Sequence, residues 1–138
     1  RFNINDESCT NHFIQHALAE TVSGDESGAK NLLSELKARR DKTVAGLNAI
    51  EEIHVPKPES TFYLFPNVTK VMAKKEFTDL DEFRIAALES TGVSFCARHH
   101  FGTPLEHETE HYIRLAYSGI TQNDIREGLG KLKSWLEG

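Results

Sequence analysis

The chain has 138 residues, of which 38% are hydrophobic and 27% charged, and its formal net charge at pH 7 is -5. A chain of this length and composition is typical of one soluble globular domain. The negative charge argues against a protein that binds nucleic-acid phosphates, and the lack of a long apolar run argues against a membrane span. We expect Cys9 and Cys96 to be free thiols of a reducing, cytoplasmic compartment, with one long-range disulfide as the alternative.

Two helices are predicted before any strand. Ser8 or Thr10 can cap the first helix, whose apolar residues recur every three or four positions until Gly24. The second helix covers 25–50, and its turns at 38–43 are polar on almost every side. That pattern is typical of a helix that connects two bodies. The chain opens without methionine, so we expect a processed product or a piece of a longer protein.

The rest of the chain alternates short strands and helices. Thr78 with Asp81, and Thr121 with Asp124, have the spacing of a capping box at a helix start. Residues 68–75 fit either a turn of helix or a loop. In order, we predict strands at 52–55, 61–65, 93–97 and 111–118, and helices at 78–90 and from 121 onward. This order predicts an α+β fold, with a small mixed or antiparallel sheet, helices packed on one face and a long connecting helix before them.

The predicted strand at 111–118 carries an arginine in an otherwise apolar segment. Alternation places Ile113, Leu115 and Tyr117 on a face suited to a helix-covered core, and Arg114 on the opposite face. An arginine in a central strand is costly to bury unless a carboxylate or another anion meets it. An internal ion pair, an exposed edge strand and a clamp for a ligand carboxylate all fit this pattern.

A zinc-protease pattern, H-E-x-x-H, occurs at His107–His111. Zinc chemistry needs both histidines one turn apart on a helix. Here the segment lies between Pro104 and a predicted strand, so we expect no metal ligand in it. His99 and His100 lie where a strand passes into a loop, and we interpret them as surface residues with an acid–base role as the alternative.

The chain contains, in order, the segments Phe13–Ala17, Ser60–Asn67, the capped helix up to Gly92-Val93, Phe101-Gly102, Tyr112–Tyr117 and the terminal helix. Together they resemble the C-terminal part of class I/II aminotransferases, the fold-type-I pyridoxal-phosphate enzymes related to aspartate aminotransferase. The resemblance runs from about Ser8 to Leu136 and depends on the order and spacing of its segments. Two departures bear on substrate choice, because Ser60-Thr61 replaces the family's Gly-Ala and Arg98-His99 replaces its Pro-Gly.

The resemblance implies that Arg114 binds the α-carboxylate of a substrate through two parallel hydrogen bonds. It also implies amino-group transfer between an amino acid and a 2-keto acid, pyridoxal 5'-phosphate as cofactor, and a homodimer. We place no lysine of this chain at the family's cofactor-binding position, and we find no glycine-rich phosphate loop in it. We therefore assign no catalytic, cofactor-binding or metal-binding residue here, and expect those groups in the rest of the parent chain and no activity from this chain alone.

The resemblance further implies a division into three parts. Residues 1–24 would be the tail of the large cofactor-binding domain, 25–50 the connecting helix, and 51–138 the C-terminal small domain. Two alternatives stay open at this point. One is a stand-alone binding domain of the same fold without chemistry, and the other is a zinc hydrolase that uses His107 and His111.

Overall fold

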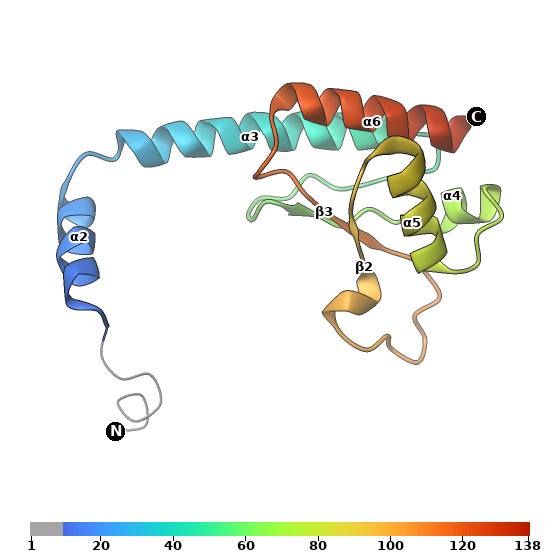
Figure 1. The fold of residues 1–138 in the computed structure, drawn as a ribbon, viewed down its shortest axis with the longest axis horizontal. Helices are drawn as coiled ribbons and strands as arrows, with labels where there is room; N and C mark the ends of the chain where they lie inside the picture. The colour runs from blue at the N-terminus through green and yellow to red at the C-terminus, as the bar shows by residue number, and fades with distance from the viewer. Residues whose placement is uncertain (1–9) are drawn as a thin grey trace. The chain divides into compact units, whose positions relative to one another are not determined.

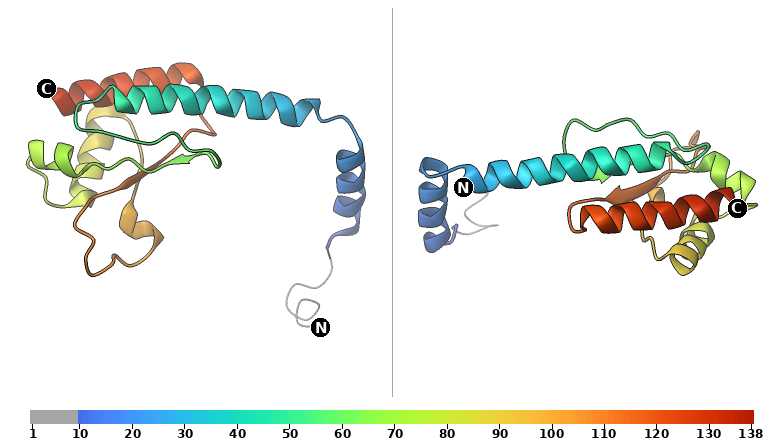
Figure 2. Two further views of the ribbon diagram at one scale, coloured as in Figure 1. Left: turned by 180° about the vertical axis from the view of Figure 1, so that it is seen from behind. Right: turned by 90° about the horizontal axis from the view of Figure 1, so that it is seen from above.

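The computed structural model describes residues 10–138 and divides into two compact units, Arg1–Ser34 and Glu35–Gly138. Our predictions for Ser8 and Cys9 lie outside the described residues. Figure 1 shows the element order, and Figure 2 gives two further views. No helix among residues 10–138 has the length and hydropathy needed to cross a membrane.

The first unit contains helix α2 (His12–Ser23) and the first turns of helix α3 (Ser27–Asn48). Asn11 caps α2, since its side chain accepts a hydrogen bond from the Phe13 amide at 3.2 Å, so our prediction of Thr10 as the cap is wrong. No residue of α2 is buried. Its apolar stripe is therefore exposed, at 72% for Phe13, 45% for Ile14, 54% for Leu18 and 79% for Val22.

From Glu35 onward, α3 belongs to the second unit, where α6 (Gln122–Glu137) lies beside it (Figures 1 and 2). Thr43 and Leu47 are buried, and Gly46 approaches Leu129 of α6 so closely that a Cβ atom there would lie 2.5 Å from the leucine Cδ1. The polar turns at 38–43 are half-buried or buried in this unit, and Arg39, Arg40 and Asp41 form ion pairs there.

The sheet of the second unit has the order β1-β3-β2, with β1 (Tyr63–Leu64), β2 (Cys96–Ala97) and β3 (Ile113–Ala116). Both pairs are antiparallel. The strands are shorter than predicted, and β1 ends before Pro66, which has no amide proton for a ladder. The predicted strand at 52–55 is wrong, because the Asn48 side chain bonds both the amide and the carbonyl of Val55, at 2.8 and 3.1 Å.

Short helices connect the strands. Residues 69–74 form α4 (Thr69–Lys74), and α5 (Leu80–Thr91) and the 3-10 helix η1 (Arg98–Phe101) follow. The predicted Thr78 capping box is wrong, since the Asp79 side chain accepts from the amides of Asp81 and Glu82 instead. The second predicted box, Thr121 with Asp124, is confirmed at the start of α6. Gly92 ends α5 with a left-handed φ of 75°, which favours glycine.

The core of this unit lies between the helices and one face of the sheet. Ile113, Leu115 and Tyr117 are buried as predicted, and so are the helix residues Phe83, Ala87, Ile125, Leu129, Leu132 and Leu136. The α+β prediction is confirmed: a small antiparallel sheet has its helices on one face, after a long helix. The opposite face, which carries Arg114, is left half-open.

Candidate functional site

Strand register decides which side chains surround Arg114. Arg114 pairs directly with Cys96 on β2. On the other side, Tyr63 pairs with Ala116 and Asn67 with Tyr112, and this common register sets Phe65 across from Arg114. Directly paired residues of antiparallel strands share a face. On the open face of the sheet, Tyr63, Phe65 and Cys96 therefore lie around the guanidinium of Arg114.

Aromatic rings pack on the guanidinium of Arg114. Its Cζ atom lies 3.8 Å from the ring centroid of Phe101 and 4.2 Å from that of Tyr63. Phe65 packs against Phe101, with ring centroids 6.2 Å apart in an edge-on arrangement. A guanidinium over a ring gains about 0.5–2 kcal/mol and keeps the N–H groups at its edge free. We call Tyr63, Phe65 and Phe101 the aromatic cluster of this site.

Among the described residues, the charge of Arg114 has no partner. Within residues 10–138, no carboxylate lies within ion-pair distance of it and no hydrogen bond involves its side chain. The other half-buried arginines of that range are all paired: Arg39 with Glu35, Arg40 with Asp41, Arg84 with Asp81, and Arg98 with Glu108. A half-buried guanidinium without an internal partner is well suited to bind a carboxylate or phosphate of a ligand.

Polar groups border this face on one side. The guanidinium of Arg98 contacts the carboxylate of Glu108 at two atoms, both at 3.1 Å, and donates a hydrogen bond to the Gly102 carbonyl. These contacts connect the two ends of the loop after η1. The hydroxyl of Tyr112 donates to Glu110 at 2.7 Å, and this hydrogen bond raises the pKa of the tyrosine. An open pocket of about 600 Å³ lies beside them, lined by Phe65, Arg98, Glu108, Tyr112 and their neighbours.

The remaining predicted residues do not join the Arg114 site. Residues 107–111 form a loop, so the two histidines of the zinc pattern lack the helix that metal binding needs, and Glu108 is paired with Arg98. Cys96 is a free, half-buried thiol that pairs with Arg114 in the sheet. His99 and His100 belong to η1 and point at Asp81, a grouping that the sequence did not indicate.

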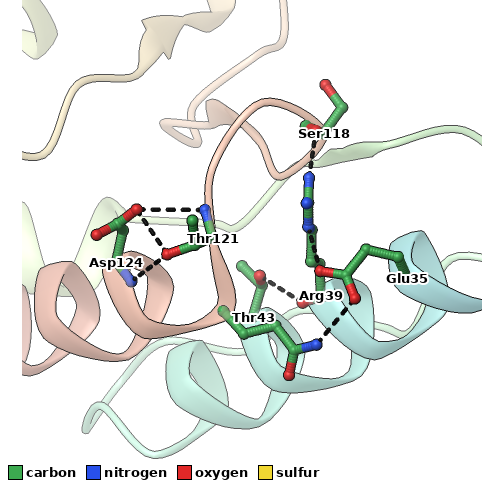
Figure 3. Close-up of polar contacts among 7 residues, drawn as sticks. Glu35, Arg39, Thr43, Ser118, Thr121 and Asp124 are labelled. Carbon is green, nitrogen blue, oxygen red and sulfur yellow. Dashed lines mark hydrogen bonds and ion pairs between the residues drawn. The ribbon is translucent and has the colours of Figure 1, made fainter. Parts of the chain in front are cut away.

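The end of β3 is anchored to helix α3 (Figure 3). The carboxylate of Glu35 accepts from Arg39 at 2.8 Å and from Gln122 at 3.1 Å. Arg39 in turn donates to the carbonyl of Ser118, two residues beyond β3. These contacts join α3, the loop after β3 and the start of α6, and they hold the strand that carries Arg114 in place.

This anchor should weaken in acid. The hydrogen bond from Arg39, followed by that from Gln122, lowers the pKa of Glu35 below its ordinary value of 4.5. A carboxylate with a lowered folded-state pKa stabilises the fold above its unfolded pKa and loses that contribution as pH falls through the folded value. We expect Glu35→Gln to reduce the melting temperature near neutral pH, and the difference from the unchanged chain to shrink below about pH 4.

Thermal unfolding followed by circular dichroism between about pH 7 and about pH 3 measures this. Glu59→Gln is the matched control, because Glu59 is exposed and the structure pairs it with no cation among the described residues. A difference in melting temperature that stays constant across that pH range would show that the charge of Glu35 does not stabilise the contacts between α3 and the loop after β3.

A family model for "Aminotransferase class I and II" matches residues 3–132 of the chain. The chain is 31% identical over 123 residues to an asparagine–oxo-acid transaminase of Streptococcus mutans. The aligned region covers 89% of this chain and 30% of the relative. It is 32% identical over 131 residues to an aspartate aminotransferase of Sulfurisphaera tokodaii, covering 94% of this chain and 31% of the relative. The chain thus spans about 30% of the length of these relatives.

Solved structures give the same fold. An aromatic aminotransferase from Pyrococcus horikoshii superposes with a TM-score of 0.81 at 22% identity, over 99% of this chain and 34% of that one. An alanine aminotransferase from Pyrococcus furiosus superposes with a TM-score of 0.77 at 23% identity, over 96% of this chain and 32% of that one. At such identities the likeness concerns the fold alone.

Proposed function

Because this chain belongs to the class I and II aminotransferase family, we propose that it is the C-terminal part of a pyridoxal-phosphate-dependent aminotransferase. The whole enzyme would move an amino group between an amino acid and a 2-keto acid. The chain spans only about 30% of its relatives, and this supports a parent protein with further segments. We also propose the cytoplasm as its location and a homodimer as its assembly.

In this proposal Arg114 binds the α-carboxylate of the substrate. The observation that carries it is that Arg114 is half-buried without a carboxylate among the described residues, while Arg39, Arg40, Arg84 and Arg98 are paired. The aromatic cluster orients the guanidinium and lowers the local exposure to water. Both effects strengthen a hydrogen-bonded pair between a guanidinium and a carboxylate.

The proposed three-part division accounts for the exposed stripe of α2. Residues 1–24 would belong to the large domain, 25–50 to the connecting helix and 51–138 to the small domain. Four large apolar side chains of α2 are 45–79% exposed. Such an amphipathic helix gains most of its stability by packing its apolar stripe against a partner. We propose that the rest of the parent chain covers this stripe.

Pyridoxal phosphate, when bound, supplies the electron sink for amino-group transfer. The described residues around Arg114 do not fit a complete site for it, because Tyr63, Phe65, Cys96 and Phe101 include no lysine. We therefore propose that the residues that hold the cofactor belong to the rest of the parent chain. In consequence, this chain alone would bind a substrate carboxylate weakly and would not catalyse the transfer.

The parent gene product provides the test. Its intact mass and its absorbance in the cofactor band show whether a longer chain carries pyridoxal phosphate, and an assay with amino acids and 2-keto acids shows the transfer. We expect a longer, yellow protein with transaminase activity. A colourless product without activity would remove the enzyme proposal and favour a stand-alone binding domain, an alternative that is compatible with the separate core of Glu35–Gly138.

A further inference from the structure

Three metal-ligating side chains converge away from Arg114, at the start of α5 and on η1. Nε2 of His99 lies 3.0 Å from Oδ2 of Asp81, and Nε2 of His100 lies 3.8 Å from Oδ1. All three groups offer ligand atoms within 4.8 Å of one another. The two imidazoles pack edge-on at 4.6 Å between ring centroids. Adjacent histidines of a tight helical turn thus direct the same ring nitrogen toward one carboxylate.

We propose that Asp81, His99 and His100 form a binding site for a first-row divalent cation of the Zn²⁺ class. Two neutral imidazoles and one carboxylate are a ligand set that such ions bind, whereas Mg²⁺ prefers oxygen ligands alone. Ligands about 2.1 Å from a tetrahedral ion lie about 3.4 Å from each other. The separations of 3.0 Å from His99 to Oδ2 and 3.8 Å from His100 to Oδ1 lie on either side of that value, and side-chain rotation would bring both imidazoles toward Oδ2.

The surroundings leave a coordinating oxygen available. Arg84 contacts Oδ1 of Asp81 through its Nε at 3.0 Å, while the nearer histidine contact is to Oδ2. Arg84 can therefore keep its hydrogen bond and orient the carboxylate, as outer partners of metal ligands commonly do. The next arginine, Arg98, is paired with Glu108 and does not compete. The imidazoles are 39% exposed, which gives an ion and its remaining water ligands access from solvent.

A bound ion would join two elements that are separate in sequence. Asp81 belongs to the first turn of α5, and both histidines belong to η1. The same 3-10 helix carries Phe101, whose ring packs on Arg114. The cation would therefore restrict the motion of η1 and fix one ring of the aromatic cluster. This proposal does not depend on the aminotransferase proposal, since it concerns only ion binding.

Isothermal titration of the chain with Zn²⁺ tests the site, with Mg²⁺ as the matched ion. Every protein in the series carries His12→Ala and His16→Ala, because those histidines lie one turn apart on α2, with rings 4.7 Å apart, and could bind an ion themselves. We expect one equivalent of Zn²⁺ to bind and Mg²⁺ not to bind. Asp81→Asn, or His99→Ala with His100→Ala, should weaken Zn²⁺ binding by at least about tenfold.

His107→Ala with His111→Ala is the control pair, because these histidines lie in the neighbouring loop outside the cluster. It should leave Zn²⁺ binding unchanged. A second measurement follows the imidazole proton resonances of the chain that carries only His12→Ala and His16→Ala, so it does not depend on the folding of a cluster variant. Zn²⁺ should shift the resonances of His99 and His100. Binding that survives the loss of both cluster histidines, binding lost with the control pair, or no binding at all would overturn the proposal.

Discussion

Arg114→Ala is expected to reduce kcat/KM for amino-acid substrates of the proposed intact aminotransferase by roughly 30- to 4,000-fold. That range corresponds to the loss of about 2–5 kcal/mol when one partner of a desolvated, hydrogen-bonded charge pair is removed. The size of the effect follows from the surroundings of the side chain. The aromatic cluster packs on the guanidinium at 3.8 and 4.2 Å, and no described carboxylate competes for its charge.

Arg114→Lys separates charge from shape. Lysine keeps the positive charge but has no planar fork, so it cannot form two parallel hydrogen bonds or stack on Phe101 in the same way. We expect this variant to recover only part of the lost activity. Steady-state kinetics are measured with an amino acid and with the corresponding amine, which has no α-carboxylate. The substitution should lower kcat/KM for the amino acid and leave kcat/KM for the amine unchanged.

Arg126→Ala is the matched control, because Arg126 lies exposed on α6 and its loss should not change kcat/KM. Equal losses for the amino acid and the amine would show that Arg114 supports the fold rather than the carboxylate. Circular dichroism of each variant checks that the proteins compared are folded to the same extent.

Phe83→Ala is expected to have the largest effect on stability, about 3–5 kcal/mol, which is the usual cost of removing a buried phenylalanine ring. Phe83 is 1% exposed and belongs to α5. Its ring lies 5.6 Å from that of Phe77, 6.0 Å from Phe95 and 5.5 Å from Trp135. Truncation would leave a cavity among three aromatic rings from different elements, and such rings cannot all move inward to fill it.

Urea unfolding followed by tryptophan fluorescence measures the loss, because Trp135 is the only tryptophan of the chain and contacts Phe83. Ile85→Ala is the matched control on the same helix, since Ile85 is 47% exposed. We expect Ile85→Ala to cost less than about 1 kcal/mol, as surface substitutions usually do. Similar losses for the two variants would mean that the aromatic contacts around Phe83 do not dominate this core.

Local patterns predicted several elements because their causes are local. Thr121 and Asp124 cap α6 through bonds between residues three positions apart, and Gly92 ends α5 through its own backbone conformation. Predictions failed where a distant group intervened. Asn48 bonds the backbone of Val55 and prevents a strand there, and Asp79 takes the capping role that a neighbouring threonine was expected to have.

The sequence by itself determined the α+β class and the alternation of β3, while the role of Arg114 came from the resemblance and stays a prediction. Each of these depends on spacing along one segment or on the order of segments. Only the tertiary structure decided that Arg114 has no described carboxylate beside it and that Phe65, Cys96 and Phe101 surround it. It likewise decided that His99 and His100 meet Asp81. These facts depend on strand register and on contacts between distant elements, which no local pattern in one chain specifies.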